Sequence, residues 1–325
     1  MSRDLRRGYT TGVHASFAFR SALDTFVATN RQSISYTNKM DNSDLDITKG
    51  CEIVVSISNR LDDLKLNPIQ HKPHIIDNLS LYAGIGVGVV TKNGLKISKD
   101  YPAINPTPLK SIEGIYRKFG QNRIIFSTIS VTDGNQLTKF TANSKVGVEG
   151  GISILGTTGF VKPISSSAYI NSIRVELNFI KANGYREAIL TLGNSSLEYA
   201  KRYYSKEQIV EVGNFVYDSF KIAQELNITK VLFIAGIGKM VKIYQGYKNT
   251  HNRFGSIDFN WLKRDIKKSL GVEIDIQTTK TVKGLSMQLE KLNLKDKLYT
   301  LIEQMAKMQI DRWFPQIDIE IRILK

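Results

Sequence analysis

The sequence predicts two domains of different class: a mixed α+β domain over residues 1–163 and a doubly wound, mostly parallel α/β domain over residues 164–325. A length of 325 residues suits two domains of roughly 150 residues each. In the first half, strand patterns lie between two amphipathic helices. In the second half, helical periodicity alternates with short apolar strands, which is typical of a parallel sheet with helices on both faces.

The elements of the first half follow from apolar spacing and from glycine-containing turns. Apolar side chains recur at helical spacing after a polar turn, and period-two alternation predicts the strands. In chain order, the sequence predicts a turn at 8–12, a helix to about residue 26, strands from 33 to about 90, a helix with its apolar face at 109–119, and a β-hairpin centred on Asp133-Gly134 within 123–140.

The second half repeats a helix and then an apolar strand. A serine run at 165–167 precedes the first helix, and Ser205 with Gln208 forms a capping-box pattern for the second. The closing segment alternates isoleucine with charged residues, which predicts a half-exposed edge strand. The predicted segments are a helix at 170–180, a strand at 188–192, a helix at 209–226, strands at 231–235 and 272–276, a helix at 298–308 and the edge strand at 317–323.

Charge and cysteine content limit the partners and the compartment. Forty-five Lys and Arg against thirty Asp and Glu give a formal charge of +15. This charge favours an acidic partner (nucleic acid, a polycarboxylate or a phosphorylated ligand), although a basic surface without a specific role is an alternative. The single Cys51 excludes an intramolecular disulfide and a cysteine zinc site. With no secretory signal and no apolar run near about 18 residues, a soluble cytoplasmic protein is expected.

Two glycine-rich turns in the first half are candidate binding sites. The turn at 8–12 opens a helix, whose N-terminus could hold a carboxylate or phosphate; alternatively, Thr10 or Thr11 only caps the helix. The stretch 145–163 (KVGVEGGISILGTTGFVKP) clusters five glycines beside Thr157 and Thr158. Such glycines allow either a ligand-facing turn or a tight crossing between packed layers, and composition alone does not separate the two.

In the second half, the Gly236-x-Gly238-Lys239 turn follows a strand, where α/β sheets bind ligands. It lacks the third glycine of a dinucleotide fingerprint and the Ser or Thr of a P-loop. His71 and His74 have the spacing of a metal pair, but they flank a proline in a polar loop without a third ligand, so no metal site is predicted. His251 is the better functional candidate. No catalytic triad or carboxylate pair can be identified.

Seven motifs in this order resemble the CbiD family, the cobalt-precorrin-5B C1-methyltransferases of anaerobic cobalamin biosynthesis, and the match covers most of the chain. The 150–159 block is the longest and most specific. The motifs are GYTTG at 8–12, DITKG at 46–50, GVGVVTKNGL at 86–95, PAINP at 102–106, GGISILGTTG at 150–159, IGKMVK at 237–242 and NTH at 249–251.

The resemblance implies S-adenosylmethionine as methyl donor and a carboxylate-rich tetrapyrrole as acceptor, which is methylated at C-1 to give cobalt-precorrin-6A. Cobalt enters only as part of the substrate. Nucleic acid and membrane partners are not expected, and a homo-oligomer is left open. The chain departs from the family pattern at Val13-His14-Ala15, where Thr-Cys-Ala is usual, and at Ala235-Gly236, where a His is common. The shared residues therefore favour binding over acid–base catalysis, and no catalytic side chain is assigned.

The resulting hypothesis divides the ligands between the two halves. The second half is expected to bind the adenosine end near Gly193, Asn194, Gly236, Gly238 and Lys239. The alternatives are a basic RNA-binding protein, which is weakened by the lack of aromatic residues interleaved with basic ones, and a nucleotide-dependent oxidoreductase. The residues expected to hold the tetrapyrrole are Thr10, Thr11, Gly12, Asn105, Gly150, Gly151, Thr157, Thr158, Gly159 and His251.

Overall fold

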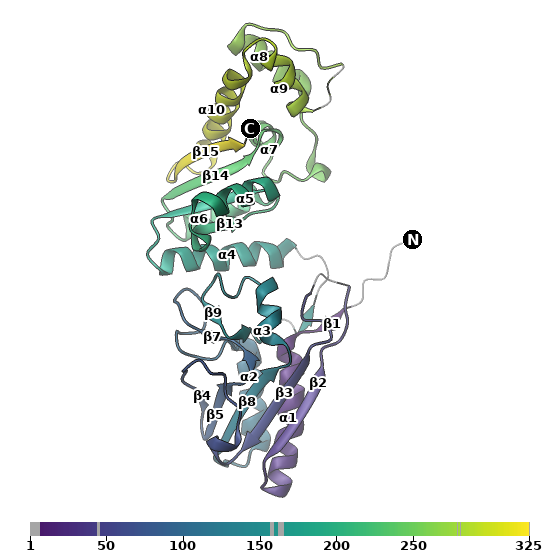
Figure 1. Ribbon diagram of the computed structural model, residues 1–325, viewed down its shortest axis with the longest axis vertical. Helices are drawn as coiled ribbons and strands as arrows, with labels where there is room; N and C mark the ends of the chain where they lie inside the picture. Colours follow the sequence, from purple (N-terminus) through teal and green to yellow (C-terminus); the bar gives the residue numbers. More distant parts are fainter. Residues whose placement is uncertain are drawn as a thin grey trace. The chain divides into compact units, whose positions relative to one another are not determined.

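The computed structural model of the chain describes residues 7–43, 46–156, 159–161, 166–277, 279 and 281–324 (Figure 1). The chain divides into two compact units, Met1–Ser166 and Ser167–Lys325. The first unit mixes helices with antiparallel and parallel strands, and the second alternates helices with parallel strands. The predicted α+β and α/β classes are confirmed.

The N-terminal unit is a five-stranded sheet covered by two helices. The strand order is β2-β3-β8-β5-β4, in which only the β5–β8 pair is parallel. Phe19, Leu23 and Phe26 recur on one side of the first helix and share a core with the inward-facing residues of the sheet. The elements are α1 (Thr11–Thr29), β2 (Ser33–Asn38), β3 (Glu52–Ser58), a 3-10 turn (Leu61–Asp63), β4 (His74–Ile76), β5 (Leu79–Ala83), α2 (Pro106–Phe119) and β8 (Ile125–Val131).

Three pairs of very short strands join the rest of this unit. They bring the glycine-rich stretches of the sequence against each other, since Gly151 pairs with Gly86. The pairs are β1 (Gly8–Tyr9) with β11 (Phe160–Val161), antiparallel; β6 (Gly86–Val87) with β10 (Gly151–Ile152), parallel; and β7 (Val89–Val90) with β9 (Val148–Glu149), antiparallel.

The predicted β-hairpin at Asp133-Gly134 is wrong. After β8 the chain enters a short helix, α3 (Gly134–Leu137), and then a 3-10 turn (Thr138–Phe140). The backbone N–H groups of Gln136 and Leu137 donate to the Asp133 carbonyl, so no strand returns. Gly134 is required by packing, because an added Cβ would lie 2.1 Å from the Gly86 carbonyl oxygen. The Asp-Gly pair therefore marks a close approach, not a hairpin turn.

The C-terminal unit is a four-stranded parallel sheet in the order β13-β12-β14-β15. Helices cover both faces: Leu190 and Phe233 belong to the larger core, whereas Ile189 and Ile234 pack with Ala200 on the opposite face. The elements are α4 (Ser166–Ala182), β12 (Glu187–Leu192), α5 (Asn194–Tyr203), a 3-10 turn (Lys206–Gln208), β13 (Ile209–Glu211), α6 (Val216–Glu225), β14 (Lys230–Gly236), α7 (Ile237–Tyr244), a 3-10 turn (Asn252–Phe254), α8 (Phe259–Leu270), α9 (Val282–Glu290), α10 (Lys295–Trp313) and β15 (Asp318–Leu324).

The predicted edge strand at the C-terminus is confirmed as β15, but two other predictions are wrong. The capping-box pattern at Ser205 forms only a 3-10 turn. The helix begins at Val216 because residues 209–211 pair with β12 as a three-residue edge strand. Residues 272–276 form no strand. None of the helices in the described ranges is long and apolar enough to cross a membrane.

Candidate functional site

Two helices of the N-terminal unit begin against the same short segment, residues 154–156. Gly12 N, at the start of α1, donates to Leu155 O (3.0 Å), and Asn105 N, just before α2, donates to Ile154 O (2.8 Å). Residues predicted from three separate motifs are therefore brought together. The N–H groups of Gly12 and Asn105 are used by this segment, and Pro106 and Pro108 in the first turn of α2 have none, so the junction offers a carboxylate mainly the partial positive charge of two helix N-termini.

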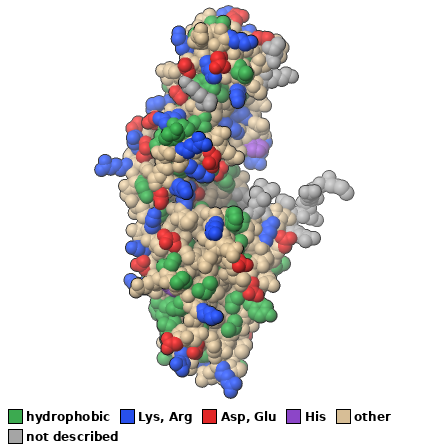
Figure 2. Space-filling view, viewed as in Figure 1, with side chains coloured by type: hydrophobic (Ala, Val, Ile, Leu, Met, Phe, Trp, Pro, Cys, Tyr) green, Lys and Arg blue, Asp and Glu red, His purple; other side chains and the backbone are tan. Residues whose placement is uncertain are grey.

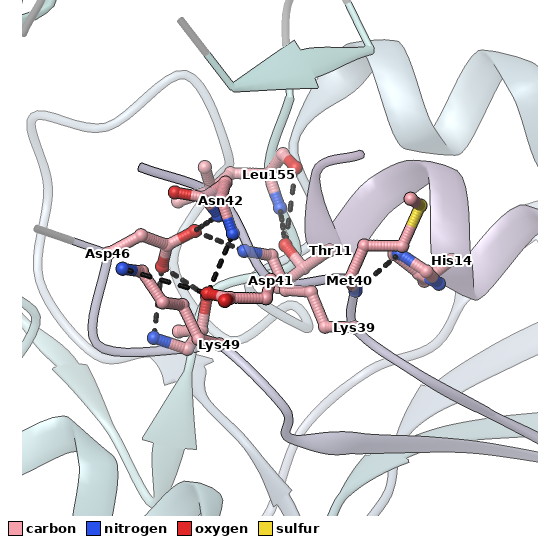
Figure 3. Close-up of polar contacts among 10 residues, drawn as sticks. Thr11, His14, Lys39, Met40, Asp41, Asn42, Asp46, Lys49 and Leu155 are labelled. Atoms are coloured by element: carbon pink, nitrogen blue, oxygen red, sulfur yellow. Dashed lines mark hydrogen bonds and ion pairs between the residues drawn. The ribbon is translucent and has the colours of Figure 1, made fainter. Parts of the chain in front are cut away.

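Thr10 and Thr11 have different roles at this junction. Thr11 Oγ1 donates to Leu155 O (3.2 Å) and accepts from Leu155 N (2.9 Å), so it fastens the backbone and is not free to bind a ligand (Figure 3). Thr10 Oγ1 is buried and has no hydrogen-bond partner in the part of the chain that the structure describes. It faces Gly156, where an added Cβ would lie 2.2 Å away. The Thr10 hydroxyl is the candidate ligand donor.

Gly150 and Gly151 make close backbone contacts inside the N-terminal unit. Their φ angles are 75° and 154°. A Cβ at Gly151 would lie 2.3 Å from the Gly86 carbonyl carbon, and a Cβ at Gly150 would lie 2.7 Å from Asn67 Nδ2. Asn67 holds the crossing by donating to Val87 O and Gly150 O, both at 2.8 Å. These two positions therefore have the contacts of a packing crossing.

The rest of the glycine block is described in part. Thr157 and Thr158 lie outside the described residues. Gly159 has φ of 78°, and its carbonyl accepts from Thr10 N (3.0 Å). Of the two interpretations that the sequence left open, the packing crossing accounts for Gly150 and Gly151. A role of the block in ligand binding stays a prediction.

His14 is a buried structural residue. Met40 N donates to His14 Nε2 (3.2 Å), so Nδ1 carries the proton and donates to Thr37 Oγ1 (2.9 Å; Figure 3 shows the Met40 contact). Burial, and then the charge of Lys39, lowers the pKa of His14. The ring is therefore a neutral bridge between α1 and the segment at and after β2.

This burial predicts that stability falls in mild acid. Because the pKa of His14 is lowered in the folded protein, the unfolded chain binds a proton more readily than the folded one. The stability that neutral His14 contributes is therefore present above its ordinary pKa of 6.5 and is lost as the pH falls below that value. We expect the unfolding free energy to fall less from pH 7.5 to 5.5 in His14→Gln than in the wild type, as measured by urea unfolding. The lowered pKa of His74 affects both proteins alike. Equal pH dependence would contradict a neutral, buried His14.

The DITKG motif, at residues 46–50, forms a cluster of an ion pair and hydrogen bonds around Asp46. The buried Lys39 ammonium pairs with Asp46 Oδ2 (Figure 3). Asp46 Oδ1 accepts from Thr48 N (2.9 Å) and Thr48 Oγ1 (2.6 Å). Burial raises the pKa of Asp46, but the hydrogen bonds from Lys39 and Thr48 outweigh it and hold that pKa below its ordinary value. With these partners, the motif organises a loop.

In the C-terminal unit, the predicted residues meet at the carboxyl edge of the sheet. Leu192 pairs with Ala235, so Gly193 and Gly236 directly follow the last pair between β12 and β14. From β12 the chain crosses to β13 on one side, whereas β14 is followed in the sheet by β15 on the other. The chain therefore diverges between β12 and β14, which is where doubly wound sheets bind ligands.

The glycines at this edge are open, unlike those of the N-terminal crossing. A Cβ added at Gly193, Gly236 or Gly238 would have no heavy atom of the described chain within 4 Å, leaving out its chain neighbours and local helix backbone. Gly193 has φ of 96° and immediately precedes α5, which begins with Asn194. Bare backbone at two adjoining helix N-termini forms a surface that a ligand can approach closely.

Lys242 of α7 is buried and hydrogen-bonded to neutral oxygens. It is 6% exposed and donates from Nζ to Thr250 O (3.2 Å), Asn252 Oδ1 (2.8 Å) and Gly255 O (2.9 Å). Burial lowers the pKa of Lys242. Its three bonds fix the loop that contains the NTH motif.

Lys239 lies one turn earlier and reaches the same loop. Its Nζ donates to Asn214 Oδ1 (2.9 Å) and Thr250 O (3.1 Å), and Asn214 Oδ1 also accepts from Thr250 Oγ1 (3.0 Å). Burial and then the charge of Lys242 lower the pKa of Lys239. An ammonium has three donors, and these bonds use two of them. Lys239 can therefore both support the loop and bind a ligand at the carboxyl edge.

His251 lies in the C-terminal unit, apart in sequence from the other residues predicted for the tetrapyrrole. Its ring is exposed, and Nδ1 accepts from Arg253 N (3.1 Å). Two surface pockets do not coincide with the predicted residues. One is lined by His74, Tyr101 and Leu109, and the other lies at the amino ends of β14 and β15, opposite the carboxyl edge of the sheet.

Known proteins match this chain over most of its length. The CbiD family model matches residues 25–163. A cobalt-precorrin-5B C(1)-methyltransferase from Methanocaldococcus jannaschii is 33% identical over 83% of this chain and 73% of its own. The chain belongs to the CbiD family. A cobalt-precorrin-5B C(1)-methyltransferase from Thermoanaerobacter is 28% identical over 99% of this CbiD chain and 93% of its own.

A crystal structure of the cobalamin biosynthesis protein cbiD from Archaeoglobus fulgidus aligns with 75% of this chain and 81% of its own. The identity is 21% and the TM-score is 0.35, which is too low to support a structural conclusion. The family resemblance predicted from the seven motifs is confirmed by the sequence matches alone.

Two residues of the candidate site were not predicted from the sequence. Asn214 joins Lys239 to Thr250, and Lys242 fixes the loop. A signal for Asn214 was present, because a second Gly-Asn pair, Gly213-Asn214, comes one residue after β13, much as Gly193-Asn194 directly follows β12. The predicted helix over 209–226 concealed this repeat. Lys242 lies inside the IGKMVK motif, but nothing in the sequence indicates its burial.

Proposed function

We propose that this chain methylates C-1 of cobalt-precorrin-5B with S-adenosylmethionine as donor, giving cobalt-precorrin-6A in anaerobic cobalamin biosynthesis. The observation that carries the proposal is membership of the CbiD family, with alignment to a relative named for this reaction over 93% of that relative's length. The dispersed charge is consistent with it: on the face in Figure 2, basic side chains lie scattered among acidic and apolar ones, without the basic stripe typical of an RNA-binding surface.

The carboxyl edge of the C-terminal sheet fits the methyl donor. Gly193, Gly236 and Gly238 leave backbone open to close approach. Lys239, hydrogen-bonded to Asn214 and Thr250, places a cation beside that backbone, where it can pair with a carboxylate. S-adenosylmethionine, when bound, supplies a methyl group activated by its sulfonium. The residues of this edge bind and orient the donor.

The N-terminal junction fits a polycarboxylate acceptor. The helices α1 and α2 begin against the same segment, and the Thr10 hydroxyl is buried without a partner in the described part of the chain. Acetate and propionate groups can accept from such donors. Methyl transfer to a ring carbon is an in-line displacement that depends mainly on alignment. The protein therefore needs to hold both ligands and exclude water, and no protein nucleophile is required.

A valine at Gly238 is expected to block donor binding without unfolding the protein. Gly238 and Gly114 are both helical glycines whose added Cβ would meet nothing within 4 Å of the described chain. We expect Gly238→Val to weaken S-adenosylhomocysteine binding about tenfold or more, because the side chain fills the approach. Gly114→Val, in α2, should bind as the wild type does. Isothermal titration calorimetry measures both affinities.

A substitution in the N-terminal unit supplies the complementary test. Thr10→Val removes an unpaired hydroxyl and should leave both stability and donor affinity unchanged while weakening tetrapyrrole binding. If Thr10→Val no longer bound the methyl donor and Gly238→Val still did, the two assignments would be exchanged.

The reaction itself is tested by incubating the protein with cobalt-precorrin-5B and methyl-labelled S-adenosylmethionine. Absence of label at C-1, where a known family member succeeds, would reject the proposed function, and steep salt-dependent RNA binding would favour the alternative.

A further inference from the structure

The edge strand β13 ends in an exposed acid at the carboxyl edge of the C-terminal sheet. Glu211 pairs with Thr191, two residues before Gly193. Along β13, Ile209 is buried in the core on the α5 face, and alternation places Glu211 on the same face, where it is exposed. The carboxylate therefore lies at the rim of the sheet, beside the strand whose end opens the glycine-lined turn.

Glu211 is not committed to a structural ion pair. Its backbone carbonyl accepts a hydrogen bond from Tyr169 Oη (3.2 Å). No carboxylate bond or ion pair of Glu211 occurs among the described residues. An ionised carboxylate has two acceptor oxygens, so it can accept from two neighbouring hydroxyl groups at once. A vicinal diol is the ligand that such an acid fits.

The backbone around Glu211 is held in place. Val212 N donates to Thr191 O (3.0 Å), and Thr250 N donates to Asn214 O (3.1 Å). Gly213, with φ of 54°, lets the Tyr169 ring pack at 3.0 Å from where a Cβ would stand. The same turn reaches Lys239 through Asn214. Glu211 and Lys239 therefore belong to one connected edge, and the backbone that carries the acid is fixed.

We propose that Glu211 binds the ribose diol of the adenosyl group, an inference that rests on the proposed function. In doubly wound sheets, an acid about 20 residues after the glycine turn, at the end of the adjoining strand, accepts from ribose hydroxyls. Gly193 and Glu211 have this spacing and this strand relationship. The acid selects a ribonucleoside over its 2′-deoxy counterpart.

The test compares S-adenosylhomocysteine with its 2′-deoxy analogue by isothermal titration calorimetry. The wild type is expected to bind the deoxy analogue about 10- to 100-fold more weakly, the range for a hydrogen bond to a charged group. Glu211→Gln should bind S-adenosylhomocysteine at least about tenfold more weakly and should discriminate between the two ligands less than about threefold. Glu187→Gln, at the amino end of β12, is the matched control and should discriminate as the wild type does.

The outcomes separate the inference from the function on which it rests. Equal discrimination by the wild type and Glu211→Gln overturns the assignment of Glu211 and leaves the methyltransferase proposal standing. Failure of the wild type to bind S-adenosylhomocysteine overturns both. Thermal unfolding checks the fold of each variant, and an unchanged midpoint is expected for Glu211→Gln because Glu211 is exposed.

Discussion

Gly151→Ala is expected to lower the unfolding free energy of the N-terminal unit by about 3 to 5 kcal/mol, the sum of overpacking and backbone strain. The new Cβ would lie 2.3 Å from the Gly86 carbonyl carbon and oxygen and 2.7 Å from Val87 N. All three are backbone atoms, so no side chain can move aside. The φ of 154° adds strain for an L-residue. The β6–β10 pair would have to separate.

Urea unfolding measures this loss, and Gly114→Ala is the control. Gly114 lies inside α2 with open space around its Cβ position, so alanine there should stabilise the protein by up to about 1 kcal/mol through helix propensity. A loss below about 1 kcal/mol for Gly151→Ala would mean that the crossing tolerates a side chain. The stretch would then be looser than its contacts indicate, and a role as an adaptable ligand surface would gain support.

The elements predicted well from the sequence are those with local signals. The helix α1 follows from apolar residues at helical spacing, and β12 and β14 follow from short apolar runs because both faces of these strands are buried. The position of the carboxyl edge also follows, since a glycine turn after a parallel strand must lie there. Whether these glycines bind the donor stays a prediction.

The elements predicted poorly depend on partners distant in the chain. Gly134 was assigned to a hairpin because its contact with Gly86 has no local signature. The strand β13 has only three residues, and its pairing with β12 overrides the helical pattern around it. The burial of Lys242 likewise depends on a loop that returns from residues 250–255. Composition left both a ligand-facing turn and a packing crossing open for the glycine block, and contact partners decide which glycines pack.

Lys242→Met is expected to cost about 2 to 3 kcal/mol and to loosen the loop at 250–255. Methionine replaces the buried stem but removes the charged donor to Asn252 Oδ1 and Gly255 O, and a hydrogen bond from a charged group contributes about 1.5 to 3 kcal/mol. Asn252 is exposed and Gly255 is half-buried, so water replaces part of the lost bonding. Burial disfavours the charged form of Lys242 and so lowers its pKa; removing this buried charge offsets part of the cost. Hydrogen exchange should show faster amide exchange in the loop, and urea unfolding gives the global loss.

Lys239→Met separates support of the loop from ligand binding. Lys239 is less buried, and Thr250 O keeps its bond from Lys242, so the stability cost should be below about 1.5 kcal/mol. Affinity for the methyl donor should fall about tenfold or more if the third N–H of Lys239 binds a carboxylate of that ligand. Equal stability losses for the two variants, with donor affinity unchanged in Lys239→Met, would assign both lysines to the loop alone. Loss of affinity in Lys239→Met at near-normal stability would instead place a ligand anion at the carboxyl edge, where α7 begins.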